Sequence, residues 1–159
     1  MSVYLLANEQ ETKQFAEKIA QYCPKNEQLV IFLNGELAAG KTTFTRFFIQ
    51  ALGYHGIVKS PTYTIVEAYQ LPKYRILHID LYRLRFSTEV LEIGLCDELD
   101  QASIFLIEWP ERATSFLPAP DIVCTFTMLV AHRQVALESY SASGQKLLQL
   151  CCFGSWFPS

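Results

Sequence analysis

The amino-acid sequence predicts an α/β fold in which a mixed β-sheet is flanked by helices. Residues 29–33 and 104–107 form two short, uninterrupted apolar runs, rich in β-branched and aromatic residues, which is typical of strands buried on both faces. Apolar residues recur at helical spacing over residues 9–22, and a second helix is predicted over residues 43–52. Strands that are buried on both faces need helices on either side of the sheet, so these patterns together indicate the α/β class.

The ends of both predicted helices carry the expected signals. Asn8 is suited to cap the N-terminus of the first helix, because its side chain can accept a hydrogen bond from a backbone N–H of the first turn. Pro24 prevents that helix from continuing, and Gly53 is a suitable stop for the second helix.

The middle of the chain predicts an antiparallel hairpin. Residues 64–70 and 74–82 have strand character and are joined by only three residues, whereas a parallel connection needs about a dozen or more. One or two short helices are predicted over residues 87–100. Pro110 opens a short helical stretch, since proline is tolerated in the first turn of a helix.

The C-terminal part of the chain predicts a β-meander. Residues 121–130, 133–140 and 146–153 have strand character, with turns at residues 131–132 and 141–144. No internal repeat, low-complexity tract or long linker divides the sequence. Residues 1–159 are therefore expected to form a single domain.

Composition limits the classes of function. Net charge is −3 and there is no run of Lys or Arg, so contact with nucleic acid is expected only through a partner. The N-terminus lacks a signal-peptide pattern and no apolar run approaches the roughly 20 residues that span a bilayer. The five cysteines, an odd number without a C-x-x-C pair, agree with reduced thiols. We therefore expect a cytoplasmic protein without a membrane segment.

A glycine-rich loop carries the clearest chemical signal. The segment Gly35-Glu36-Leu37-Ala38-Ala39-Gly40-Lys41-Thr42 matches G-x-x-x-x-G-K-[ST] at every fixed position, between a predicted strand and a predicted helix. In such a P-loop, backbone N–H groups and the helix N-terminus surround the phosphates. The lysine adds a full positive charge, and the Thr hydroxyl binds Mg²⁺. The predicted nucleotide site comprises Gly35, Glu36, Leu37, Ala38, Ala39, Gly40, Lys41, Thr42 and Thr43.

These patterns specify a P-loop NTPase-like domain, and the nucleotide is expected to be ATP. GTPases of this class usually contain N-K-x-D to bind guanine, and the sequence has no such tetrapeptide. ATP with Mg²⁺ is therefore the predicted ligand.

Two acidic residues follow apolar strands and are candidate partners of the metal. Asp80 ends one predicted strand and Glu108 ends another, and the carboxyl ends of strands are where α/β sheets bind ligands. The alternative is that one of these carboxylates only caps a loop or pairs with an arginine such as Arg83. No two of the three histidines have metal-ligand spacing, so histidine is not expected to bind a metal.

Two neighbouring features have both a functional and a structural interpretation. Residues 60–64, Ser-Pro-Thr-Tyr-Thr, could approach the γ-phosphate as a switch, or they could simply form a turn that enters a strand. Trp109, beside Glu108, could stack on a ligand or a partner, although a buried Trp is the more common outcome.

Four linked motifs resemble the TsaE (YjeE) family. They are N-G-E-L-A-A-G-K-T-T at 34–43, V-K-S-P-T-Y-T at 58–64, H-I-D-L-Y-R-L at 78–84 and L-I-E-W at 106–109. The resemblance implies a small ATPase of tRNA threonylcarbamoyladenosine biosynthesis, weakly active alone. It would act with TsaB-like and TsaD-like proteins, which place threonylcarbamoyl on adenosine 37 of tRNAs reading ANN codons. One departure is Ala38, where the family usually has glycine.

The resemblance also assigns roles to individual residues. Lys41 would grip phosphate, Thr42 would bind Mg²⁺, and Asp80 and Glu108 would complete the arrangement of metal and attacking water. Glu108 is the first choice for the group that orients the water. Further nucleotide-site candidates implied by the family are Thr62 in the switch-like segment, Trp109 beside the nucleotide or a partner, and Thr12 and Arg133 on the adenine side.

Two other functions remain open from the sequence. One is a P-loop small-molecule kinase, although the stretch after Glu108 contains only Arg112 where kinases usually have an arginine-rich lid. The other is a non-catalytic nucleotide-gated interaction module, in which ATP binding would switch the affinity for a partner.

Overall fold

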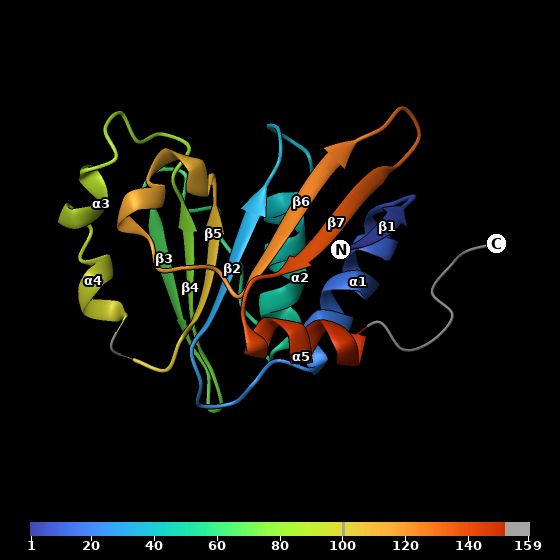
Figure 1. Ribbon diagram of the computed structural model, residues 1–159, viewed down its shortest axis with the longest axis horizontal. Coiled ribbons are helices and arrows are strands. Elements are labelled where there is room, and N and C mark those ends of the chain that lie inside the picture. The colour runs from blue at the N-terminus through green and yellow to red at the C-terminus, as the bar shows by residue number, and fades with distance from the viewer. Residues whose placement is uncertain (100, 152–159) are drawn as a thin grey trace.

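A computed structural model describes residues 1–99 and 101–151 of the chain. Within these residues, seven strands form one sheet in the order β1-β7-β6-β2-β5-β4-β3 (Figure 1). The strands are β1 (Ser2–Leu6), β2 (Leu29–Asn34), β3 (Val66–Gln70), β4 (Arg75–Asp80), β5 (Ile104–Glu108), β6 (Ile122–Met128) and β7 (Arg133–Ser139). The helices are α1 (Glu9–Gln21), α2 (Lys41–Ala51), α3 (Glu89–Glu92), α4 (Leu95–Glu98) and α5 (Ala142–Cys151), with 3-10 turns at Pro110–Arg112 and Thr114–Phe116.

The sheet is mixed, as the sequence predicts. Its centre is parallel: β2 lies between β5 and β6, and β4 follows on the far side of β5. The flanks are antiparallel, with β3 paired to β4 on one side and β7 paired to β6 on the other. The predicted hairpin of residues 64–70 and 74–82 is confirmed as β3 and β4. The parallel centre brings the carboxyl ends of β2, β4 and β5 to one edge of the sheet.

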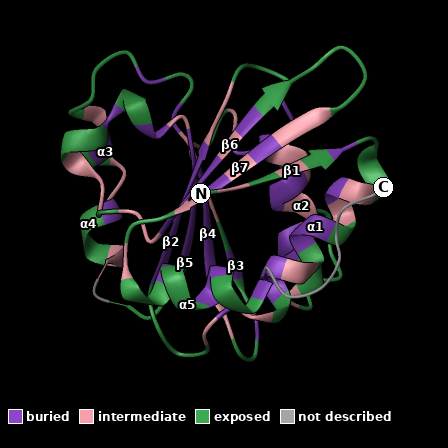
Figure 2. Ribbon diagram, turned by 45° about the vertical axis from the view of Figure 1, so that its right-hand side comes forward, coloured by how far each residue is buried: buried purple, intermediate pink, exposed green. Residues whose placement is uncertain are grey.

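Helices cover both faces of the central strands. Ile31 and Leu33 on β2 point into a core shared with α1, α2 and α5. Val30 and Phe32 on the same strand point into a second core shared with α3 and α4. Figure 2 shows the central strands as almost entirely buried. The prediction that residues 29–33 and 104–107 are buried on both faces is confirmed, because period-two alternation places apolar residues in both cores.

The helix ends confirm the predicted signals. Asn8 has an extended backbone, and its side-chain oxygen accepts a hydrogen bond of 2.9 Å from the backbone N–H of Glu11. Gly53 follows α2 with φ +110°, a conformation that glycine adopts without steric cost.

The strand predicted over residues 146–153 is wrong where the structure describes it. Residues up to Cys151 form α5, while residues 152 and 153 lie outside the described part. Leu147, Leu148 and Cys151 are buried at helical spacing. A short apolar run of this kind has no periodicity that separates a strand from a buried helix. The sequence pattern alone therefore pointed to the wrong element.

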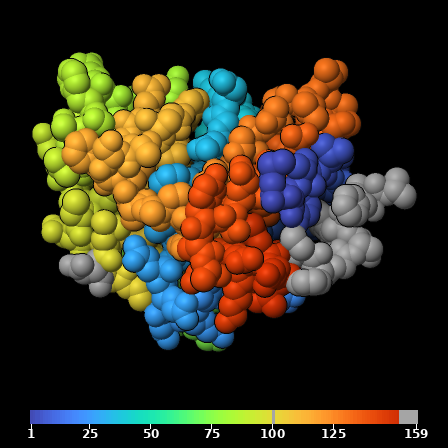
Figure 3. Space-filling model, in the orientation of Figure 1, coloured from blue at the N-terminus to red at the C-terminus, as the bar shows by residue number. Residues whose placement is uncertain are grey.

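The third antiparallel strand on this side of the sheet is β1, which the sequence analysis did not predict. It pairs with β7, so the N-terminal strand completes the three-stranded unit that the meander was expected to form. Figure 3 shows the N-terminal residues (deep blue) against the C-terminal hairpin (orange to red). Tyr4 and Leu6 face inward, but the intervening Val3 and Leu5 are exposed and apolar, so no polar alternation marks the strand.

We expect Gly144→Ala to destabilise the protein, because α5 packs on the backbone at Gly144. A Cβ there would lie 2.1 Å from the carbonyl oxygen of Asp121, a backbone atom that cannot move alone. Because the clash is with backbone, the overpacking cost should reach the upper end of about 1–3 kcal/mol or more, which exceeds the roughly 1 kcal/mol that alanine gains in helix propensity. Thermal unfolding should therefore show a Tm lower by roughly 3 °C or more.

The matched control for this prediction is Ser143→Ala, at an exposed neighbouring position of the same helix. Its Tm should stay within about 2 °C of the wild type. Equal Tm values for Gly144→Ala and the wild type would contradict the close packing of α5 on Asp121.

In residues 1–99 and 101–151, no helix combines the length and the apolar character that crossing a bilayer requires.

Candidate functional site

The glycine-rich loop connects β2 to α2, and both of its fixed glycines are sterically required. Gly35 has φ +136°, and a Cβ there would lie 2.4 Å from the carbonyl oxygen of Phe126. Gly40 has φ +110°, and a Cβ there would lie 3.1 Å from Cδ of Arg133. The strand–loop–helix context predicted for residues 35–42 is confirmed. Helix α2 begins at Lys41 rather than at residue 43, so Lys41 and Thr42 form its first turn.

Lys41 is held inside the loop. Its Nζ donates hydrogen bonds to the carbonyl oxygens of Gly35 at 2.6 Å and Glu36 at 2.8 Å, and only 4% of the residue is exposed. The ammonium lies 4.3 Å from the ring centroid of Trp109, a cation–π contact. Burial lowers the pKa of Lys41, against the opposing effect of the Glu108 and Asp80 carboxylates. The ammonium is therefore held between the loop carbonyls and the Trp109 ring, and its charged form is less favourable there than in water.

The two predicted carboxylates lie side by side. Strand register pairs Asp80 with Glu108 across β4 and β5, and pairs Glu108 with Leu33 across β5 and β2. The hydroxyl of Thr42 donates to the Glu108 carboxylate, with oxygen–oxygen distances of 3.0 and 3.1 Å. The register thus places Glu108 beside the start of the loop and Asp80 one strand further away.

Asp80 is a half-buried carboxylate. Burial raises its pKa and the neighbouring Glu108 adds to the increase, whereas a hydrogen bond from the backbone N–H of Tyr82 lowers it. The ionised form of Asp80 is therefore less favourable here than in water, because burial removes part of its hydration.

His78 is a site residue that the sequence reasoning did not identify. Its ring is fully buried on β4, and Nε2 lies 2.8 Å from Oε1 of Glu108. Among the described residues, Nδ1 has no hydrogen-bond partner. The sequence did offer one signal for His78: it lies in an apolar strand two residues before Asp80, and the period of two in a strand places both side chains on one face. The partner, Glu108, follows only from the pairing of β4 with β5.

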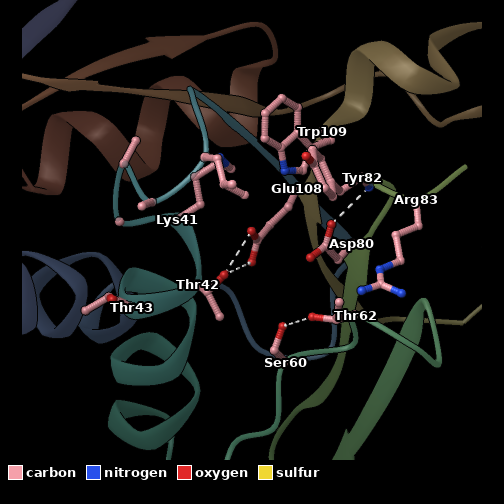
Figure 4. Close-up of a pocket in the computed structure, with 14 residues that line it drawn as sticks. Lys41, Thr42, Thr43, Ser60, Thr62, Asp80, Tyr82, Arg83, Glu108 and Trp109 are labelled. Atoms are coloured by element: carbon pink, nitrogen blue, oxygen red, sulfur yellow. Dashed lines mark hydrogen bonds between the residues drawn. The ribbon is translucent and has the colours of Figure 1, made fainter.

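Lys41, Thr42, Asp80 and Glu108 converge on a cavity of about 500 Å³ (Figure 4), whereas His78 lies behind Glu108 and does not line it. Figure 4 shows Asp80 and Glu108 pointing into the space between Thr42 and Arg83. The lining residues are Leu37, Ala38, Ala39, Gly40, Lys41, Thr42, Thr43, Ser60, Thr62, Asp80, Tyr82, Arg83, Glu108 and Trp109.

The two predicted adenine-side residues do not line this cavity. Thr12 is fully buried in α1, and its hydroxyl donates to the carbonyl of Asn8, so the structure does not bring it to the cavity. Arg133 packs against Gly40 and lines a separate hollow of about 300 Å³, together with residues 6–9 and 128–132. This hollow lies on the other side of the loop from the carboxylates.

The segment of residues 60–64 borders the cavity opposite the loop. The hydroxyls of Ser60 and Thr62 are 2.7 Å apart, and both residues line the cavity (Figure 4). Tyr63 is 85% exposed, and Cζ of Arg83 lies 4.5 Å from its ring centroid. The structure places the segment at the cavity wall, while a position near the γ-phosphate and a role as a switch stay predictions.

Strained backbone gathers around this site. Among the described residues, the non-glycine positions with positive φ are Asn26, Ala38, Ile65 and Trp109. Ala38 and Trp109 line the cavity, and the carbonyl of Ile65 accepts the backbone N–H of Asp80 at 2.9 Å. Such strain tends to persist at functional sites, where the surrounding structure holds it in place.

We expect Ala38→Gly to stabilise the protein. Ala38 has φ +63°, a left-handed conformation that is costly for a residue with a Cβ and free for glycine. The net gain should be about 0.5–1 kcal/mol, after the greater entropy of glycine in the unfolded chain is subtracted. Thermal unfolding should show a Tm higher by roughly 1–4 °C.

Ala39→Gly is the matched control. Ala39 is buried and has no positive φ, so glycine there should lower the Tm by a similar amount. If both variants lower the Tm, Ala38 is not strained.

Comparison with known proteins agrees with this geometry. The family model described as "Threonylcarbamoyl adenosine biosynthesis protein TsaE" matches residues 6–135. The tRNA threonylcarbamoyladenosine biosynthesis protein TsaE of Haemophilus influenzae is 38% identical over 137 residues, covering 84% of this chain and 87% of the relative. The protein of the same description from Bacillus subtilis is 36% identical over 111 residues, covering 70% and 68%.

A solved structure supports the fold. The crystal structure of Bacillus subtilis YdiB matches with a TM-score of 0.79 and 26% sequence identity, covering 94% of this chain and 93% of that chain. The predicted α/β class is confirmed by this match and by the mixed sheet.

Proposed function

The chain belongs to the TsaE family of threonylcarbamoyladenosine biosynthesis proteins, and from this we propose that it is an Mg²⁺-dependent ATPase. Its hydrolysis would support threonylcarbamoyl transfer to adenosine 37 of ANN-reading tRNAs, through TsaB-like and TsaD-like partners. The observation that carries the proposal is the convergence of Lys41, Thr42, Asp80 and Glu108 on one cavity beside the phosphate-binding loop.

Phosphate recognition would rest on the loop and on the start of α2. Backbone N–H groups at a helix N-terminus carry a partial positive charge that favours an anion. Lys41 would leave the carbonyl oxygens of Gly35 and Glu36, to which it is now bonded, and donate to the β- and γ-phosphates. Arg133, against Gly40, suits the nucleoside end of ATP.

The donors in the cavity fit Mg²⁺. This ion prefers oxygen ligands and is usually bound by one or two carboxylates together with phosphates and water. The Thr42 hydroxyl and the Glu108 carboxylate are in contact, and Asp80 lies next to Glu108 in register. When bound, Mg²⁺ would neutralise negative charge on the phosphates.

Glu108 would orient the attacking water. Its side chain is buried at the cavity wall and held from two sides, by Thr42 and by His78. A buried carboxylate in a defined orientation suits general-base or water-positioning chemistry. Trp109 covers Lys41 and would help to exclude bulk water from the phosphates.

A nucleotide-gated interaction module is the second candidate. Tyr63 beside the cavity is almost fully exposed, as a residue that contacts a partner would be. In this case the chain would bind ATP and change its affinity for the partner without needing hydrolysis.

Reconstitution tests the proposed function. TsaB-like and TsaD-like proteins would be mixed with tRNA, ATP, threonine, bicarbonate and the enzyme that forms threonylcarbamoyl-adenylate. We expect many turnovers of modified tRNA per assembly only when the wild-type chain is added. A Glu108→Gln chain is the matched control, since it separates ATP hydrolysis from binding. Equal turnover numbers with and without the wild-type chain would contradict the assignment.

A further inference from the structure

We propose that His78 is a positioning residue that fixes the carboxylate of Glu108 for hydrolysis. This inference rests on the proposed ATPase function. Nε2 of His78 lies 2.8 Å from Oε1 of Glu108, and the two side chains are 0% and 3% exposed. Since a carboxylate that orients water only accepts hydrogen bonds, the proposal requires the proton of His78 to be on Nε2.

His78 and Thr42 contact Glu108 in different ways. The Thr42 hydroxyl bonds both carboxylate oxygens and lies at the cavity, where it is a candidate metal ligand. His78 bonds only Oε1, and the fourteen residues that line the cavity do not include it. His78 thus contacts one carboxylate oxygen from outside the cavity, and this contact would keep Glu108 oriented when a ligand occupies the cavity.

The strands hold the His78 ring in position. Its backbone is paired on both sides, with Glu67 on β3 and with Leu106 on β5. Since β5 also carries Glu108, the same pairing that forms the sheet sets the distance between the imidazole and the carboxylate. A small displacement of a catalytic group can lower a rate about 100-fold, so this rigidity matters for the reaction.

The burial of His78 is not explained by packing alone. Ile76, two residues earlier on the same face of β4, and Leu106, the strand partner of His78, are buried and apolar, so an apolar side chain would suit this position equally well. In the described part of the chain, Nδ1 of His78 has no partner, so the imidazole leaves one polar atom unsatisfied. The contact that compensates for this burial is the hydrogen bond to Glu108.

Substitution by leucine and by glutamine tests the proposal. His78→Leu keeps a similar side-chain volume but removes the N–H donor, whereas the amide of His78→Gln can donate near the position of Nε2. At saturating Mg-ATP we expect His78→Leu to lower kcat about 10- to 100-fold, with the Kd for ATP within about 3-fold of the wild type. His78→Gln should recover kcat to within about 5-fold of the wild type. Thr45→Val is the matched control, because Thr45 is a buried polar residue on α2 whose hydroxyl also has no partner among the described residues, and its kcat should be unchanged.

The outcomes separate this inference from the proposed function. If the wild type hydrolyses ATP and folded His78→Leu does so equally fast, or if His78→Gln is as slow as His78→Leu, the positioning role is wrong. If His78→Leu does not fold, His78→Asn replaces it, because the shorter amide cannot reach Glu108 and should be slow where glutamine is fast. A wild type that hydrolyses no ATP, alone or with its partners, contradicts the proposed function instead.

Discussion

Replacing Glu108 by glutamine is expected to lower ATP turnover at least about 100-fold while the Kd for ATP stays within about 3-fold. Glutamine keeps the size of the side chain and can still accept hydrogen bonds from Thr42 and His78, so the cavity should keep its shape. It lacks the negative charge and the basicity needed to orient and activate water, and loss of such a group typically costs about 10²–10⁴ in rate. Phosphate release at saturating Mg-ATP and calorimetric titration measure the two quantities separately.

Glu111→Gln is the matched control for this substitution. Glu111 is exposed, lies three residues further along and does not line the cavity, so its turnover should equal that of the wild type. If the turnover of Glu108→Gln were within about 3-fold of the wild type, Glu108 would not be the group that orients the attacking water. Asp80→Asn would then be the next variant to measure, since Asp80 is the neighbouring carboxylate.

Replacing Lys41 by methionine is expected to weaken Mg-ATP binding about 10- to 100-fold. The ammonium would make charge-assisted hydrogen bonds to phosphate, each worth about 1.5–3 kcal/mol, and methionine keeps the apolar stem without the charge. At a ligand concentration of about 100 times Kd, the wild type should gain about 2.7 kcal/mol of stability, which corresponds to a rise in Tm of roughly 5–11 °C. The variant should show a rise of roughly 1–6 °C at the same concentration.

The same variant should not be less stable without nucleotide. Burial lowers the pKa of Lys41, so its charged form is less favourable in the folded chain than in the unfolded chain. This cost in free energy of unfolding is fully present below the pKa that Lys41 has in the folded chain, and it disappears as pH rises towards the pKa of Lys41 in the unfolded chain. Removal of the charge at neutral pH should therefore leave the Tm equal or higher.

Lys59→Met is the control for both measurements, because Lys59 is exposed and does not line the cavity. A Lys41→Met chain that still supports tRNA modification would contradict both the ATPase and the nucleotide-gated module.

The sequence by itself determined those features whose information is contiguous in the chain. The glycine-rich loop is one continuous segment, and its two glycines, its lysine and its threonine carry the requirement for positive φ and the charge within eight residues. The apolar strands of residues 29–33 and 104–107 and the β3–β4 hairpin also follow from local pattern and connection length. Asp80 and Glu108 could be chosen as candidates because a carboxylate at the end of an apolar strand is costly without a partner.

Only the tertiary structure decided which distant segments meet. Thr12 is buried in α1 and Arg133 lines a separate hollow, so neither lines the cavity that holds the two carboxylates, and their place on the adenine side stays a prediction. Strand β1 has no recognisable alternation until β7 pairs with it, and α5 is distinguished from a strand only by the core that it covers. His78 gained a role only through Glu108, thirty residues away, because strand register rather than local pattern sets the distance between their side chains.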